Sequence, residues 1–242
     1  FFNDIFEDSQ NNLWIAIDNG LINFNRISKR VTDSVKINAV IVNNDSIKNK
    51  VCTVAEDLYN NLWIFSLNGI YHYNRIIHKL TDYISFDIKY EDIFDVDKKF
   101  IKFVLRDKKG DFLIRTTNGV YKFNPQQKKL KLLFKFNDEI KSTSLTDGNI
   151  YQTYDGNIWF AALPDLYEFD KNFNLHTYTV KDCPDLGFCN IFQDKDSLIW
   201  IYTNNGLFKF NKKNKAFRYY SNDDGLVDNG INGLVDDGRG NL

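Results

Sequence analysis

The chain has 242 residues, of which 43% are hydrophobic and 16% aromatic, so it carries ample apolar side chains for a buried core. Its 31 basic and 32 acidic residues give a net charge of −1, which indicates neither a nucleic acid nor an anionic membrane as partner. Acidic residues intersperse the lysine pairs, so we expect these pairs at solvated loop tips. The pairs are Lys98 and Lys99, Lys108 and Lys109, Lys128 and Lys129, and Lys212 and Lys213.

A segment of about fifteen residues recurs along the chain at intervals of about 41 to 50 residues, a period typical of β-propeller blades. The copies are NNLWIAIDNGLINFN from Asn11, NNLWIFSLNGIYHYN from Asn60, GDFLIRTTNGVYKFN from Gly110, GNIWFAALPDLYEFD from Gly156, SLIWIYTNNGLFKFN from Ser197, and GNL from Gly240.

Each copy predicts two strands joined by a turn. The first begins with the apolar run at Trp14, is broken at Asn19 and Gly20, and resumes with alternating apolar residues. Asn-Gly favours a type I′ hairpin turn, because both central residues of that turn need positive φ. The pair recurs at 68–69, 118–119 and 205–206, whereas the fourth copy has Pro164 and Asp165 and must turn differently.

Two further strands flank each copy. An apolar stretch ending in an acidic or polar turn precedes most copies, as at 5–8 and 191–194, and a fourth extended run follows, as at 130–134 or 216–220. We therefore predict an all-β fold, a β-propeller of four-stranded antiparallel blades, with five repeats plus the start of a sixth. Trp14, Trp63, Trp159 and Trp200 are expected at equivalent buried positions.

The expected blades are approximately 1–50, 51–99, 100–147, 148–187 and 188–230, with a partial blade at 231–242. Because a closed ring holds a whole number of blades, we expect this chain to be a fragment of a larger propeller with seven blades.

The sequence predicts no metal or cofactor site and no catalytic residues. Cys52, Cys183 and Cys189 do not combine with the three histidines in a zinc-ligand spacing, and the Asp-led turns do not match a calcium-binding loop. Cys183 and Cys189 either form a disulfide or remain thiols, and we expect thiols. Nucleophile-elbow, phosphate-loop and zinc-protease motifs are absent, as is an apolar run of the ~18 residues that a membrane span needs.

The segment from Asp8 to Asn25 carries Glu-Asp before a polar turn, then Leu-Trp-Ile, Asn-Gly-Leu and Phe-Asn. It resembles the two-component regulator propeller repeat of the sensor regions of hybrid two-component systems in Bacteroidetes. The segment from Asp223 to Leu226 is similar to the linker of that repeat, and the resemblance covers essentially the whole chain.

The resemblance implies a periplasmic sensor region that recognises an oligosaccharide and signals to glycan-utilisation genes. It implies a parent protein that is anchored in the inner membrane, carries a histidine kinase outside this chain and forms a homodimer. Two alternatives remain open: a propeller enzyme acting on polysaccharide, such as a lyase or glycosidase, and a scaffold propeller for protein contacts.

Two groups of residues are candidates for ligand binding. Tyr83, Phe86 and Tyr90 lie in the long connection 80–100 and either stack on sugar rings or anchor the loop as core aromatics. The second group is found two residues after the tryptophan position. The side chain there is small in two copies but large in three, namely Phe65, Arg115 and Tyr202.

Arg115 is the most informative of these candidates, because a guanidinium between sheets needs an acidic partner or a ligand anion. A turn aspartate is the expected partner, and a sulfated or uronate-containing saccharide is the alternative. We expect a saccharide to bind the face formed by the Asn-Gly tips and the connections between blades.

Overall fold

The protein is described by a computed structural model that covers residues 2–38, 40–42, 45–47, 50–67, 69–86, 101–136, 148–181, 189–234 and 237. These residues form five four-stranded antiparallel sheets, one two-stranded hairpin and a short 3-10 helix, Asn222–Asp224. We number the sheets 1 to 5 in chain order. They belong to two compact units, of which unit 1 holds sheets 1 to 3 and unit 2 holds sheets 4 and 5. The all-β prediction is confirmed.

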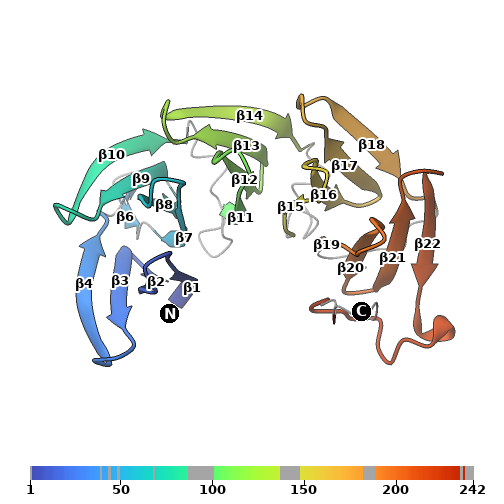
Figure 1. Cartoon of the computed structure of the whole chain (residues 1–242), viewed down its shortest axis with the longest axis horizontal. Helices are drawn as coiled ribbons and strands as arrows, with labels where there is room; N and C mark the ends of the chain where they lie inside the picture. The colour runs from blue at the N-terminus through green and yellow to red at the C-terminus, as the bar shows by residue number, and fades with distance from the viewer. Residues whose placement is uncertain are drawn as a thin grey trace. The chain divides into compact units, whose positions relative to one another are not determined.

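In unit 1 the strands of each sheet are adjacent in chain order. The first strands β1, β7 and β11 lie on the inner side of this unit and contact one another in succession, while β4, β10 and β14 lie on its outer side (Figure 1). This is the packing of consecutive propeller blades. The strands are β1 (Phe2–Glu7), β2 (Leu13–Ile17), β3 (Gly20–Asn25), β4 (Arg30–Lys36), β7 (Val51–Glu56), β8 (Leu62–Ser66), β9 (Gly69–Asn74), β10 (Lys79–Ser85), β11 (Ile101–Arg106), β12 (Phe112–Thr116), β13 (Gly119–Asn124) and β14 (Lys129–Lys135).

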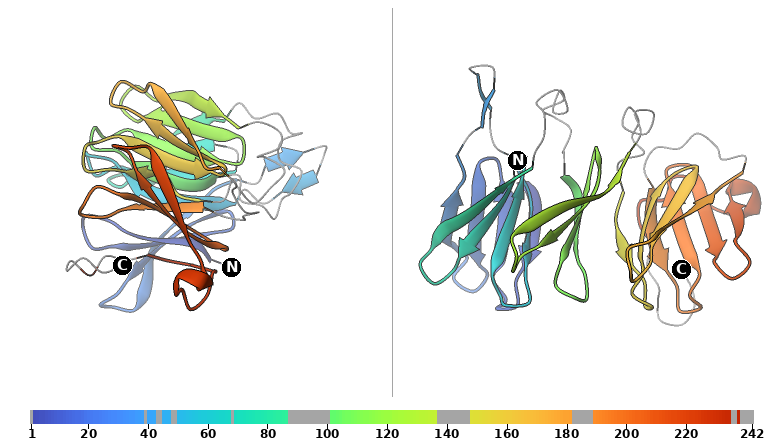
Figure 2. Two further views of the ribbon diagram at one scale, coloured as in Figure 1. Left: turned by 90° about the vertical axis from the view of Figure 1, so that its right-hand side faces the viewer. Right: turned by 90° about the horizontal axis from the view of Figure 1, so that it is seen from above.

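A small hairpin of β5 (Val40–Val42) and β6 (Asp45–Ile47) belongs to the connection between sheets 1 and 2. It stands out from one end of these sheets, as the right-hand view of Figure 2 shows.

Unit 2 repeats the same design with two sheets. The second strand of sheet 4 contacts the first strand of sheet 5. The strands are β15 (Tyr151–Gln152), β16 (Ile158–Ala162), β17 (Asp165–Phe169), β18 (Leu175–Thr179), β19 (Cys189–Gln193), β20 (Ile199–Thr203), β21 (Gly206–Asn211) and β22 (Ala216–Tyr220).

The turn between the second and third strands differs from the predicted type I′ form. Ile17 pairs with Gly20, so the central residues are Asp18 and Asn19, of which only Asn19 has positive φ, at 65°. The Asn-Gly pair is thus shifted by one position, and its glycine begins the third strand. A Cβ atom on Gly20 would lie 2.3 Å from the carbonyl oxygen of Val35 on the fourth strand. Close approach of that strand therefore explains the glycine.

An aspartate organises most turns between the first and second strands. In sheet 2, Asp57 Oδ1 accepts hydrogen bonds from the backbone N–H groups of Tyr59 and Asn61 at 2.8 and 3.0 Å, and Oδ2 accepts one from Trp63 Nε1 at 3.0 Å. Asp8 and Asp194 bind their turns and tryptophans in the same way. These carboxylates therefore serve the turns, as predicted from the sequence.

Asp8 is buried, and its environment favours the ionised form. Burial raises the pKa of its carboxyl, but the hydrogen bonds from Trp14 and Asn12 and the charge of Arg75 together outweigh burial. The pKa of Asp8 is therefore below its ordinary value of 3.8. The fourth sheet lacks this carboxylate: Thr153 takes the position, and its hydroxyl donates to the Asn157 carbonyl at 3.0 Å.

In sheets 2 and 5 the residue at this place, just before the turn aspartate, joins the sheet to the preceding one. Glu56 of sheet 2 accepts the backbone N–H of Ser9 in sheet 1 at 2.8 Å and also pairs with Arg75 at 2.8 Å. In sheet 5 the corresponding Gln193 accepts the backbone N–H of Tyr154 in sheet 4 at 2.8 Å. We call the contact between successive sheets of one unit a seam.

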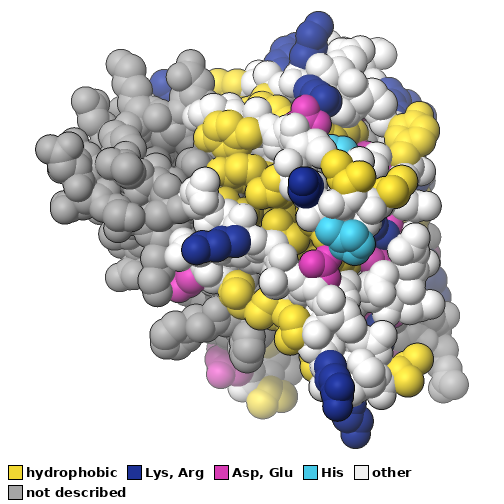
Figure 3. Space-filling model, turned by 90° about the vertical axis from the view of Figure 1, so that its left-hand side faces the viewer, with side chains coloured by type: hydrophobic (Ala, Val, Ile, Leu, Met, Phe, Trp, Pro, Cys, Tyr) yellow, Lys and Arg dark blue, Asp and Glu magenta, His cyan; other side chains and the backbone are white. Residues whose placement is uncertain are grey.

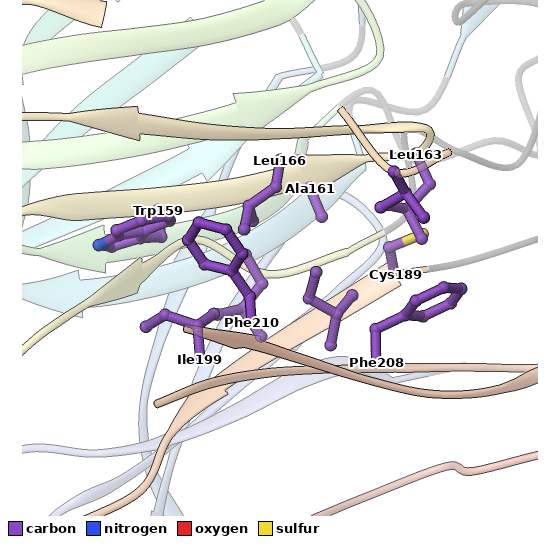
Figure 4. Packing of buried hydrophobic residues seen from close by; sticks show 11 residues of the cluster. Trp159, Ala161, Leu163, Leu166, Cys189, Ile199, Phe208 and Phe210 are labelled. Carbon is purple, nitrogen blue, oxygen red and sulfur yellow. The ribbon is translucent and has the colours of Figure 1, made fainter. Parts of the chain in front are cut away.

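Hydrophobic clusters fill the seams between the sheets. In unit 2 the cluster joins Trp159 and Leu166 of sheet 4 to Ile199, Phe208 and Phe210 of sheet 5 (Figure 4). The ring centroids of Trp159 and Phe210 lie 6.0 Å apart. Full burial of such aromatic side chains is the main stabilising contribution to each seam.

The four tryptophans occupy the same register position in their sheets. Trp14, Trp63 and Trp159 are buried, as predicted. Trp200 is only half-buried. The three buried rings each contact an aromatic side chain of the following sheet, and no sheet follows sheet 5 among the described residues.

Candidate functional site

Two of the predicted ligand-binding residues lie inside the protein. Phe65 and Arg115 occupy equivalent positions on β8 and β12 and have no exposed surface. The Phe65 ring packs edge-on against Phe112 of the next sheet, with the centroids 5.4 Å apart. A ligand in solution therefore reaches neither side chain in this structure.

The three aromatic residues predicted to form a loop site do not share one environment in the structure. Phe86 is buried in the cluster of sheets 2 and 3, where its ring lies 5.9 Å from that of Tyr121. Tyr83 is 49% exposed and rests against Tyr71, with the ring centroids 4.8 Å apart. Tyr90 lies outside the described residues. Of this group, Tyr83 alone is seen to present a ring to solvent.

Tyr202 belongs to the other unit, on β20, opposite Asn190 and Leu207. It is half-buried, and burial raises the pKa of its hydroxyl. Tyr83 in unit 1 and Tyr202 in unit 2 are the two described candidates with exposed surface. Neither shares a site with another candidate of its own unit.

A groove in unit 2 presents the aromatic surface that a saccharide site needs. It has a volume of about 420 Å³ and lies between the end of β18 and strands β21 and β22, within the range of ~300 to 1,000 Å³ typical of small-molecule sites. Phe217 and Tyr219 of β22 and Phe208 of β21 supply the aromatic wall, and Lys181 and Lys215 supply the charges.

Tyr219 is held in place as a flat platform. Its hydroxyl donates to the carbonyl oxygen of Asn205 at 2.9 Å, and its ring lies 4.9 Å from that of Phe208. The ring also covers Gly206, where an added Cβ atom would lie 2.4 Å from it. With 36% of its surface exposed, Tyr219 offers a fixed ring face and loses little freedom on binding a ligand.

The sequence signal for this groove was present but incomplete. The run Ala216–Tyr220 was predicted as a fourth strand. The alternation of apolar and polar residues that predicts a strand does not indicate ligand binding. Tyr83 stands in the equivalent place on β10 and also covers the hairpin glycine, Gly69. The candidate residue Tyr83 and the groove residue Tyr219 therefore hold the same position in their repeats.

A second cavity, of about 450 Å³, lies at the opposite end of the same seam, among the strand turns. Beneath it, the carboxylate of Glu168 is fully buried and accepts hydrogen bonds from Asn157 Nδ2 at 2.6 Å and Tyr178 Oη at 2.9 Å. Lys212 of sheet 5 also binds this carboxylate and lies over the Trp159 ring. Lys212 lies in an exposed turn, as predicted, and its ammonium group is in addition the partner of a buried carboxylate.

The outer edge of unit 1 is closed by ionic contacts. His78 Nδ1 of sheet 2 lies 2.8 Å from Asp33 Oδ2 of sheet 1, and Tyr73 Oη also donates to Asp33. Burial raises the pKa of Asp33, but the hydrogen bonds from Tyr73 and His78 hold it below 3.8. On this side of the molecule, histidine lies beside acidic side chains (Figure 3).

No group of three or more His, Cys, Asp or Glu residues within the described ranges is arranged to hold a metal ion. Cys52 and Cys189 are buried, and Cys183, the other member of the suggested disulfide, lies outside those ranges. The part of the chain that the structure describes contains no helix long and apolar enough to cross a membrane.

The structure is similar to the extracellular domains of two putative hybrid two-component systems from B. thetaiotaomicron. Both share 22% sequence identity and a TM-score of 0.61 with this chain, covering 90% and 93% of it and 29% of each of those domains. It is also similar to virginiamycin B lyase from Staphylococcus aureus, with 10% identity and a TM-score of 0.61 over 91% of this chain and 69% of the lyase.

These similarities show a β-propeller fold. The chain spans less than a third of the two sensor domains that it matches. No protein-family model matches the sequence, and no curated protein matches it significantly.

Proposed function

We propose that this chain is the ligand-sensing region of a periplasmic sensor in a hybrid two-component system and that its ligand is an oligosaccharide. The repeat resembles that of such sensors, and two extracellular domains of this kind share the fold. In this proposal the kinase and the membrane anchor belong to other parts of the parent protein, and the region binds its ligand without cleaving it.

The observation that carries the proposal is the groove beside Tyr219. Saccharide sites combine an aromatic ring face with flanking polar side chains, and the groove supplies a fixed Tyr219 ring, the Thr179 hydroxyl and two lysines. Tyr83 and the connections between blades remain a second candidate surface for the same ligand.

Calorimetric titration of the chain against a library of oligosaccharides tests the proposal. We expect at least one oligosaccharide to bind and Tyr219→Leu to weaken its binding, because leucine keeps the apolar contact but removes the flat ring and hydroxyl. Tyr83→Leu is the matched control, since Tyr83 covers a hairpin glycine in the same way in unit 1. A loss of binding only in Tyr83→Leu moves the site to unit 1.

Two outcomes contradict the proposed function. The first is no binding by any member of the library. The second is the appearance of shorter products when the incubated oligosaccharides are separated by chromatography, which assigns the region to the enzymes.

A further inference from the structure

The positions of Lys181 and Lys215 suggest the kind of ligand that the groove takes. Lys181 follows β18 of sheet 4, and Lys215 lies in the turn before β22 of sheet 5. They line the groove from its two sides, and no Asp or Glu is among the described residues that line it. The groove is therefore apolar along its wall and positively charged at its edges.

Comparison with unit 1 shows that no acidic side chain of the described residues takes the corresponding place beside Lys215. The counterparts of Lys215 are His78 in sheet 2 and Lys128 in sheet 3, since all three have positive φ at the end of the same turn. His78 lies 2.8 Å from Asp33, and Lys128 lies 2.7 Å from Asp82, each on the fourth strand of the preceding sheet. Both seams of unit 1 are thus closed by a contact between this turn and an aspartate, a hydrogen bond from His78 in one and an ion pair with Lys128 in the other.

In unit 2 the aspartate of this pair is replaced. Asp33, Asp82 and His176 hold the same register position, each two strands across from the tryptophan position of its sheet. With a histidine there, Lys215 has no carboxylate opposite it. Within the described ranges, neither Lys215 nor Lys181 forms an ion pair.

One acid does lie close to the groove, but it is already engaged. Asp165 accepts a hydrogen bond from the Thr179 hydroxyl at 2.7 Å and another from Tyr167 Oη at 3.2 Å. Burial and the neighbouring Asp165 raise the pKa of Tyr167, so this hydroxyl remains a donor to the carboxylate. Asp165 is therefore held by two hydroxyls of sheet 4, and among the described residues it forms no ion pair with Lys181 or Lys215.

The groove runs from Lys215, just before β22, along the strand to Tyr219, about 14 Å at the rise of ~3.4 Å per residue in an antiparallel strand. An elongated ligand with flat apolar ring faces and anionic groups matches this shape and charge, whereas a neutral sugar leaves both lysines unused. A carboxylate or sulfate paired with an exposed lysine makes a small favourable contribution to binding, and this contribution falls as salt rises.

We propose that the groove binds an acidic oligosaccharide, with its rings against Phe217 and Tyr219 and its carboxylate or sulfate groups paired with Lys181 and Lys215. This inference rests on the proposed function and specifies its ligand. The acidic saccharide assigned from the sequence to Arg115 is thereby placed in unit 2, because Arg115 is fully buried.

The test measures binding of charged and neutral saccharides of equal size to the complete chain by calorimetry. Trigalacturonate is compared with maltotriose for the carboxylate, and sulfated lactose with lactose for the sulfate. The Lys181→Gln/Lys215→Gln double variant is compared with Lys213→Gln, which removes an exposed lysine of the same turn from outside the groove.

We expect the acidic member of at least one pair to bind more tightly than its neutral match. The double variant should weaken that binding about tenfold at low salt, because it removes both exposed ion pairs, and Lys213→Gln should leave it within about twofold. Backbone amide NMR signals of Lys181, Lys215 and Tyr219 should shift on titration and identify the site.

Equal affinities for charged and neutral saccharides overturn this inference and leave the proposed function standing, as does equal binding by the double variant and Lys213→Gln. If no saccharide of either kind binds, the inference and the proposed function fail together. Preference for only one acidic pair identifies carboxylate or sulfate as the group that the lysines recognise.

Discussion

The aspartate turn of sheet 2 allows a quantitative prediction for Asp57→Ala. This change removes the acceptor of four donors: the backbone N–H groups of Tyr59 and Asn61, the side-chain amide of Asn61, and Trp63 Nε1. The three amide donors of the turn gain water as a substitute, so each loss costs ~0.5 kcal/mol, whereas the buried indole N–H is left without an acceptor at ~1 to 3 kcal/mol. We therefore expect a loss of about 3 kcal/mol.

For a chain of this size, ~1 kcal/mol corresponds to a change of about 2 to 4 °C in Tm, so Asp57→Ala should lower Tm by roughly 6 to 12 °C. Urea unfolding followed by circular dichroism and by tryptophan fluorescence gives the free energy and tests whether both probes report one transition. Asp57→Asn should be intermediate, because its amide keeps one acceptor but turns a donor toward Trp63.

Asp196→Ala is the matched control. Asp196 lies in the same turn of sheet 5, where its backbone N–H bonds to Asp194 but its exposed side chain makes no hydrogen bond within the described residues. We expect a change within ~0.5 kcal/mol for this control. If Asp57→Ala is no less stable than Asp196→Ala, the aspartate does not hold the turn and the reasoning is refuted.

Three further changes probe unit 2 and the outer seam of unit 1. Lys212→Met should destabilise the chain by about 2 kcal/mol because it leaves Glu168 buried without its cation, and adding Glu168→Gln should restore most of that loss; equal stability of the single and double variants in urea contradicts this. Gly206→Ala should displace Tyr219 and lower Tm, since φ of +102° and the 2.4 Å approach of the ring both oppose a Cβ atom; an unchanged Tm and unchanged Tyr219 NMR signals refute it. Asp33→Asn should lower Tm at about pH 7, and the difference should shrink toward about pH 2, because a carboxyl with a lowered pKa stabilises the fold above its unfolded pKa and loses that contribution as it protonates. A pH-independent difference between the two proteins contradicts this assignment.

The sheets were predictable because the residues that determine each sheet lie close together in the sequence of one repeat. Asp57 and the turn after it, the Trp63 position and the hairpin glycine all act within a few residues of one another, so one sequence segment specifies three strands. The error at the hairpin has a tertiary cause. Gly20 is needed for the approach of Val35 on another strand, a contact that turn preferences alone do not contain.

The candidate site was less accessible to sequence analysis. Arg115 and Phe65 were chosen as large side chains at a variable position, but that position lies among the packed strands, and both are fully buried. Lys181 and Lys215 belong to different repeats and share a groove only because sheets 4 and 5 are packed together. Among the described residues Lys215 has no acidic partner, because His176 takes the place that an aspartate holds in sheets 1 and 2. This follows only from comparing the strand register of several sheets.

In repeats 2 and 5 the residue before the turn aspartate matches the groups that the preceding repeat offers. Glu56 suits a preceding turn that offers the Ser9 hydroxyl and an arginine nearby, whereas Gln193 suits one that offers the backbone amide of Tyr154. If repeats 2 and 5 were exchanged by recombination, Arg75 would move together with Glu56, because both belong to repeat 2. Glutamine would then meet Ser9 and Asp8 would lose its arginine, while Glu56 and Arg75 would arrive beside Tyr154. Repeats of this kind are therefore not interchangeable. A substitution on one side of a seam requires a matching substitution on the other side.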